Sequence, residues 1–110
     1  MNKQTRIFIA DPNEEFSANL AKALAANEEF AVLGTAADGE KAVEFLETTP
    51  VDVLILDLTL PKLDGISVLK RASALENAPQ AIVLSGFLSD YIGAMTENLG
   101  VRYYMSKPCD

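Results

Sequence analysis

Four polar side chains in this sequence stand at or close after the ends of short apolar runs: Asp11, Asp57, Ser85 and Lys107. If these runs are parallel β-strands, all four side chains lie at one edge of a sheet, where ligands of open α/β sheets bind. Mg²⁺ takes oxygen ligands from one or two carboxylates, a lysine supplies a point charge for phosphate oxygens, and a serine hydroxyl donates one hydrogen bond. We therefore expect a site for a hard cation and a phosphoryl group.

Asp57 is the residue on which we expect this chemistry to be centred. The apolar residues 53–56 lead directly into it, and a turn containing Pro61 follows. A near-unbroken apolar run predicts a strand buried on both faces, as in a parallel sheet. Carboxylates are rarely buried without a partner or a task. Asp64-Gly65, further along, is better interpreted as a turn and a helix start.

Each candidate also has a structural interpretation. Asp11 could be a helix N-cap, with Pro12 at the first helical position and Glu14 three residues on. Ser85 could be a turn residue, because a glycine follows it, and Lys107 could be an ordinary solvated lysine.

Alternating strands and helices are predicted along the chain. The apolar runs predict strands at residues 7–10, 30–36, 51–57, 81–84 and 101–105. Between them, apolar spacing predicts four helices, marked in turn by Phe16, Leu20 and Leu24; by Ala42, Val43 and Leu46; by Ile66, Leu69 and Ala72; and by residues 88–98. This alternation favours a parallel sheet with helices on both faces.

The fifth predicted strand lacks the helix that a sheet of this kind needs after it. The sequence ends two residues after Pro108. We therefore expect part of one sheet face to be bare and apolar, which invites a partner. A chain trimmed before this helix is the simplest explanation.

Composition excludes several classes of function. The 110 residues suit one domain, and the net charge of −7 argues against direct binding of nucleic acid. The chain has no histidine, so Ser-His-Asp and histidine–metal chemistry are excluded. Its only cysteine, Cys109, rules out an internal disulfide. No membrane span and no signal peptide are predicted, so a cytoplasmic location is expected.

The chain resembles the receiver domains of two-component response regulators over essentially its whole length. Among these it is most similar to the sporulation-initiation (stage 0) type, by residues 51–57, by residues 60–65 and by Ile9-Ala10-Asp11. The resemblance implies a flavodoxin-like five-stranded parallel sheet of order 2-1-3-4-5, with residues 1–110 as the receiver domain. It implies a histidine kinase or histidine phosphotransfer protein as partner, possible homodimerisation, and DNA contact only through an output domain outside this sequence.

The resemblance also implies a role for each candidate residue. Asp57 is expected to be the phosphoacceptor that attacks a phosphohistidine, and Lys107 and Ser85 to contact the phosphoryl group. Asp11 is expected to hold Mg²⁺ together with Asp57 and the backbone carbonyl of Thr59.

Further residues are expected to carry the switch. Tyr104 matches the aromatic residue that rotates inward on activation, although core packing is an alternative for it. Pro108 matches a proline whose preceding peptide bond is typically cis. The readout is expected on the face formed by the fourth helix and fifth strand, where Tyr91, Ile92 and Tyr103 lie.

Two positions depart from the family pattern. Pro12 stands where a second acidic residue usually ligates Mg²⁺, and proline offers neither a carboxylate nor an N–H. We therefore expect weak Mg²⁺ binding and slow phosphorylation, with Glu14 or Glu15 as weak substitutes. Cys109 stands where an aromatic residue commonly follows the proline.

Two other functions fit parts of the pattern. A pseudo-receiver would use the same fold as an interaction module with little phosphorylation, and Pro12 is its main support. A haloacid-dehalogenase-type phosphatase also uses an aspartate at a strand end. That class needs a second carboxylate two residues on as general acid, where this chain has Thr59.

Overall fold

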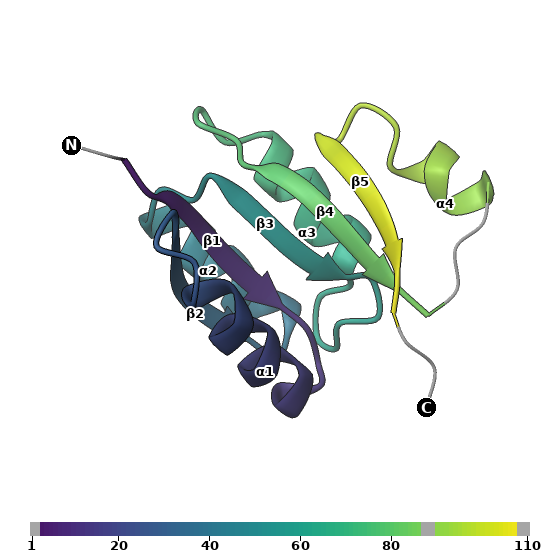
Figure 1. The fold of residues 1–110 in the computed structure, drawn as a ribbon. Coiled ribbons are helices and arrows are strands. Elements are labelled where there is room, and N and C mark those ends of the chain that lie inside the picture. Colours follow the sequence, from purple (N-terminus) through teal and green to yellow (C-terminus); the bar gives the residue numbers. More distant parts are fainter. Residues whose placement is uncertain (1–2, 87–89, 108–110) are drawn as a thin grey trace.

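The five apolar runs form one parallel sheet with the strand order β2-β1-β3-β4-β5, as predicted (Figure 1). The structure is a computed structural model that describes residues 3–86 and 90–107. Its strands are β1 (Thr5–Ala10), β2 (Phe30–Ala36), β3 (Val53–Asp57), β4 (Gln80–Ser85) and β5 (Val101–Ser106). The order 2-1-3-4-5 reverses direction at β1 and β3, so the switch point lies between the ends of these two strands.

Helices connect the strands, and side-chain caps set the first three helix starts. The helices are α1 (Glu14–Ala25), α2 (Gly39–Thr48), α3 (Gly65–Ser73) and α4 (Asp90–Met95). Asn13, Asp38 and Asp64 each accept a hydrogen bond from the backbone N–H three residues on, which satisfies a donor that the helix leaves free. The described part of the fourth helix is shorter than the predicted range 88–98. No described helix has both the length and the apolar character needed to cross a membrane.

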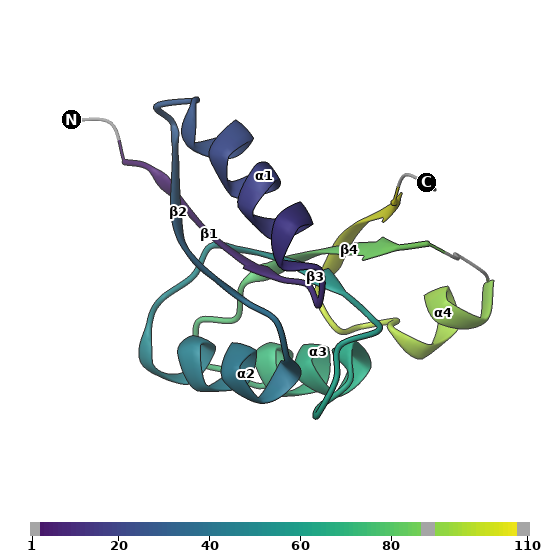
Figure 2. The same cartoon turned by 90° about the horizontal axis from the view of Figure 1, so that it is seen from below.

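Helices cover the two faces of the sheet unequally (Figure 2). On one face, α1 packs over Ile7, Ile9, Ile55 and Leu84. On the other face, α2 and α3 cover a larger core that alternate strand residues such as Phe8, Leu54, Leu56 and Val83 supply. Each such large side chain contributes about 1.5–3 kcal/mol when it is fully buried.

The bare apolar face expected near the fifth strand is present on β5. Tyr103 is 58% exposed and Met105 is 52% exposed. Their partners across the ladder are Ile82 and Leu84, which belong to the cluster beneath α1, so these two side chains lie on the α1 side of the sheet. The expectation of an uncovered apolar surface there is confirmed.

Candidate functional site

Strand register brings the predicted site residues to one edge of the sheet. Ala10 of β1 pairs with Leu56 of β3, so the residues that follow them, Asp11 and Asp57, lie side by side. Ser106 of β5 pairs with Ser85 of β4, and Lys107 follows Ser106 directly. The expected convergence of these four residues at the carboxyl edge is confirmed.

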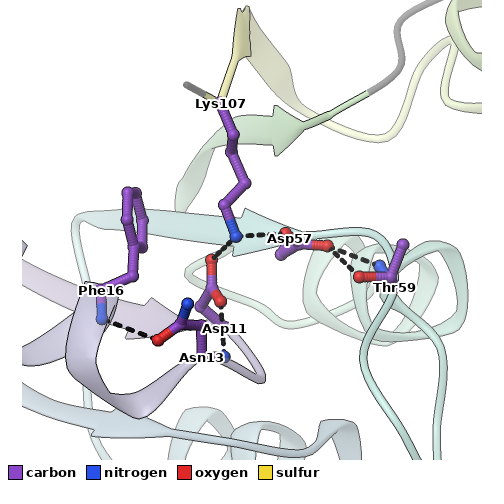
Figure 3. A network of polar contacts seen from close by, with 6 residues as sticks. All are labelled: Asp11, Asn13, Phe16, Asp57, Thr59 and Lys107. Atoms are coloured by element: carbon purple, nitrogen blue, oxygen red, sulfur yellow. Dashed lines mark hydrogen bonds and ion pairs between the residues drawn. The ribbon is translucent and has the colours of Figure 1, made fainter. Parts of the chain in front are cut away.

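Lys107 bridges the two aspartates (Figure 3). Its Nζ lies 2.8 Å from Asp11 Oδ2 and 2.9 Å from Asp57 Oδ2. Asp11 is 1% exposed and Asp57 is 4% exposed, so two buried negative charges share one ammonium. The interpretation of Lys107 as an ordinary solvated lysine is therefore wrong.

Thr59 holds the other oxygen of the Asp57 carboxylate. Its backbone N–H and its hydroxyl donate to Asp57 Oδ1 over 2.7 Å and 2.6 Å. Burial disfavours the charged form of Asp57, but the hydrogen bonds from Thr59 and Lys107 outweigh it, so the pKa of this carboxyl lies below its ordinary value. Asp57 is therefore an anion at neutral pH. A hydroxyl at position 59 offers no general acid of the kind that the phosphatase interpretation needs.

The charged state of Lys107 is secured by the same contacts. Partial burial lowers the pKa of its ammonium, but the two carboxylates raise it by more, so the pKa lies above its ordinary value. Lys107 is therefore a cation at neutral pH, in contact with the Asp57 anion and with the Asp11 carboxyl group.

Asp11 is oriented by the loop after β1 and does not cap α1. Its backbone N–H donates to the Ala36 carbonyl over 2.9 Å and continues the β-ladder, so the chain at Asp11 is still strand-like. Its Oδ1 accepts the Asn13 N–H at 2.8 Å. The N-cap is Asn13, whose Oδ1 accepts the Phe16 N–H at 3.0 Å. The N-cap interpretation of Asp11 is therefore wrong, and its carboxylate is left to face Lys107.

Ser85 is the buried last residue of β4, so the turn interpretation of this residue is wrong. Its carbonyl accepts the Lys107 N–H at 2.9 Å, which fixes the end of β5 against the end of β4. This backbone bond places Lys107 at the edge where its side chain meets the carboxylates.

Tyr104 lies on the opposite face of β5 from Tyr103 and reaches Thr96, the residue after α4. Its hydroxyl is hydrogen-bonded to Thr96 Oγ1. Thr96 is 1% exposed and donates its only hydroxyl proton to the Ile92 carbonyl at 2.8 Å, so Tyr104 is the donor of the shared bond. Tyr104 is 39% exposed, which contradicts core packing for its ring.

Some predicted features lie outside the described residues. These are the peptide bond before Pro108, the departure at Cys109 and the side chain of Tyr91.

The loop after Asp57 is anchored by two close backbone approaches. Gly65 donates its N–H to the Leu58 carbonyl at 3.1 Å, and a Cβ at Gly65 would lie 2.8 Å from the Asp57 carbonyl oxygen. Gly39 donates to the Pro61 carbonyl at 3.1 Å, and a Cβ there would lie 1.7 Å from a backbone oxygen. Only glycine fits these contacts, which tie the loop to α2 and α3.

The two carboxyl groups of Asp11 and Asp57 fit the oxygen ligands that Mg²⁺ prefers. Two buried carboxylates are the hard oxygen ligands that Mg²⁺ takes when water and phosphoryl oxygens complete its shell. Within residues 3–86 and 90–107, no group of three or more acidic, histidine or cysteine side chains is placed so that it could hold a metal ion. Glu14 and Glu15, the suggested substitutes, are exposed in the first turn of α1.

Sequence reasoning missed two contacts of the site. Thr59 is predicted only as a metal ligand through its backbone carbonyl, and the hydrogen bonds that its N–H and hydroxyl donate to Asp57 are not predicted. The spacing could have indicated them, because an aspartate side chain often accepts a hydrogen bond from the residue two positions on. Phe16 is predicted only as an apolar helix residue, yet its ring centroid lies 4.6 Å from Lys107 Nζ. Periodicity carries no signal for such a contact across 91 residues of sequence.

Comparison with known proteins agrees with the fold. The fold is similar to a chain of the CheX–CheY–BeF₃–Mg²⁺ complex from Borrelia burgdorferi, with 27% identity, a TM-score of 0.84, and coverage of 98% of this chain and 81% of that one. It is similar to the signal receiver domain of an HD domain-containing protein from Pseudomonas fluorescens, with 26% identity, a TM-score of 0.84, and coverage of 98% and 86%. A response regulator from Burkholderia pseudomallei matches with 23% identity, a TM-score of 0.84, and coverage of 97% and 62%. Residues 7–110 match the response regulator receiver domain, and the chain belongs to this family of signalling modules.

Proposed function

We propose that this domain accepts a phosphoryl group on Asp57 from a phosphohistidine of a histidine kinase or histidine phosphotransfer protein. One observation carries the proposal: Asp57 is a buried anion at the sheet edge, with Thr59 on one oxygen and Lys107 on the other. Among similar proteins, the Borrelia burgdorferi complex contains BeF₃ and Mg²⁺, and the Burkholderia pseudomallei protein carries a phosphorylated aspartic acid and a calcium ion.

In the proposed reaction, a carboxylate oxygen of Asp57 forms a bond to phosphorus while the P–N bond of the donor breaks. The electron pair of that bond stays on the donor imidazole, which takes up a proton. Lys107, 2.9 Å from Asp57 Oδ2, is already placed to offset charge on the phosphoryl oxygens. The Thr59 bonds hold the other oxygen, so the carboxylate cannot rotate freely.

Asp11, Asp57 and the carbonyl of Thr59 would hold Mg²⁺ in this proposal. The ion, when bound, supplies positive charge for the transferring phosphoryl oxygens. We propose that binding is weak because Pro12 replaces a carboxylate. A unit charge about 4 Å away is worth up to roughly 4 kcal/mol at an effective dielectric constant of about 20, before desolvation.

Phosphorylation would switch the arrangement around β4 and β5. The Ser85 hydroxyl and Lys107 would bind the phosphoryl oxygens, and Tyr104 would leave Thr96 and fill the space beside Ser85. A readout through α4 and β5, to a homodimer partner or to a transcriptional output domain, belongs to this proposal, although the exposed Tyr103 lies on the α1 side of β5 and not on the α4 side. Kinship with the sporulation-initiation type is proposed from the motifs at residues 51–57 and 60–65.

Intact-mass measurement tests the proposal. The protein is incubated with acetyl phosphate, with and without Mg²⁺, beside an Asp57→Asn control. A Mg²⁺-dependent gain of one phosphoryl mass in the wild type, absent from the control, is the expected result. If Asp57→Asn gains the same mass, the assignment of the phosphoacceptor is wrong.

The second candidate is a pseudo-receiver, and the arrangement of charged side chains around Asp57 favours it as the alternative. Lys107 already sits between the two carboxylates, and the described residues bring no third acid to them. The Pro12→Asp variant separates the two candidates. If it is phosphorylated while the wild type is not, the chain is a pseudo-receiver.

A further inference from the structure

We propose that Phe16 is a positioning residue for Lys107, an inference that rests on the function proposed for Asp57. Lys107 Nζ lies over the Phe16 ring, 4.6 Å from its centroid. An ammonium has three N–H groups, and two of them point to Asp11 and Asp57 at 2.8 Å and 2.9 Å. The ring face supplies the remaining contact as a cation–π interaction.

The Phe16 ring is held independently of Lys107. Its backbone N–H bonds to the Asn13 cap at 3.0 Å, which fixes the first turn of α1. Its side chain packs against the cluster of Ile7, Ile9, Ile55 and Leu84 beneath α1. Because the ring is held by the helix and the sheet, it forms a fixed wall for the ammonium.

This wall matters during the reaction because the other two contacts change. When Asp57 takes a phosphoryl group, its carboxylate oxygen is consumed, and Lys107 must exchange that bond for one to a phosphoryl oxygen. The contact with Phe16 is unaffected by this exchange. Phe16 therefore keeps the ammonium at the sheet edge, in a site that lacks the carboxylate usual at position 12.

Lysine resonances in the metal-free protein test the contact directly. Protons above an aromatic face resonate upfield, so the Lys107 Hε signals should be shifted upfield in the wild type. Phe16→Leu should abolish this shift and Phe16→Trp should retain it. The matched control is Phe30→Leu, the same change at a phenylalanine of β2 that packs in the same cluster. It should leave the Lys107 signals in place.

Phosphorylation by acetyl phosphate with Mg²⁺ tests the positioning role. Phe16→Leu should react about 3- to 10-fold more slowly than the wild type, the range expected for a partly desolvated cation–π contact. Phe16→Trp should restore the rate, and Phe30→Leu should stay within about 2-fold of the wild type, as for a change that leaves the reacting groups in place.

The outcomes separate this inference from the proposed function. If the wild type is phosphorylated and Phe16→Leu reacts no more slowly than Phe30→Leu, the inference is wrong and the proposed function stands. If the wild type takes no phosphoryl group, the proposed function fails, and the Lys107 signals alone decide whether Phe16 holds the ammonium. An unchanged Lys107 shift in Phe16→Leu overturns the inference in either case.

Discussion

Replacing Lys107 with methionine should destabilise the fold, because the two buried aspartates would then face each other without a counter-charge. Asp11 and Asp57 both contact the same ammonium, at 2.8 Å and 2.9 Å. Their Oδ2 atoms are therefore at most about 6 Å apart, and two like charges at that distance repel by about 3 kcal/mol at an effective dielectric constant of about 20. Breaking a buried ion pair typically costs about 3–5 kcal/mol, which agrees. We expect Lys107→Met to lower the free energy of unfolding by about 3 kcal/mol at neutral pH.

Urea unfolding in low salt with a chelator measures this loss. Lys62→Met is the matched control, because Lys62 is 60% exposed and lies 3.9 Å from Asp38. A surface pair of this kind contributes about 1 kcal/mol or less. Adding Mg²⁺ should recover part of the stability of Lys107→Met, since a cation that binds only the folded state stabilises it by mass action.

A double variant identifies the repulsion as the cause. Asp57→Asn removes one of the two charges, so the Lys107→Met/Asp57→Asn protein should regain most of the lost stability. The reasoning is refuted if Lys107→Met is no more destabilising than Lys62→Met. It is equally refuted if the Lys107→Met/Asp57→Asn protein has the same free energy of unfolding as Lys107→Met alone.

Three further substitutions test other contacts. Hydrogen bonds and the ion pair with Arg6 lower the pKa of Asp52 from 3.8 to about 2. These contacts therefore stabilise the folded state fully above the pKa of the unfolded chain, and this stabilisation is lost as the pH falls toward 2. Asp52→Asn should lower the free energy of unfolding by about 1 kcal/mol at neutral pH, a small value because both side chains are about one third exposed to solvent. In acid the same substitution should leave the free energy of unfolding unchanged, and urea unfolding across this pH range measures the difference. Gly39→Ala should cost about 2 kcal/mol or more in thermal unfolding, since its Cβ would meet the Leu63 carbonyl. Ser17→Ala should add about 1 kcal/mol in the same assay, because the buried Ser17 hydroxyl has no hydrogen-bond partner among the described residues.

Local pattern was enough to predict the sheet and its edge residues. The run before Asp57 is apolar on both faces of β3 because helices cover both sides there, and its burial is complete from Leu54 onward. The parallel order then brings Asp11 next to Asp57 without any further information. These features depend on strand periodicity and on topology, which composition and spacing encode directly.

Details of the site depended on side-chain reach, which a sequence pattern does not encode. Asp11 and Asn13 are both good N-cap residues, and the choice between them was decided by the β-ladder bond from Asp11 to Ala36. The hydroxyl of Tyr104 is hydrogen-bonded to Thr96, the residue after α4, a contact that strand periodicity does not predict. Such choices among equivalent local options are made by tertiary contacts.

The charge balance of the site connects Pro12, Lys107 and Phe16. With proline at position 12, two carboxylates remain, and the single ammonium already neutralises half of their charge. A third carboxylate would leave the site more negative, so that a divalent cation would be needed to hold the acids together. In this chain Lys107 performs part of that task, and the Phe16 ring helps to keep it there. In the proposed function, the absence of a third acid would weaken the demand for the metal as well as its binding, and it would make Lys107 the principal counter-charge of Asp57.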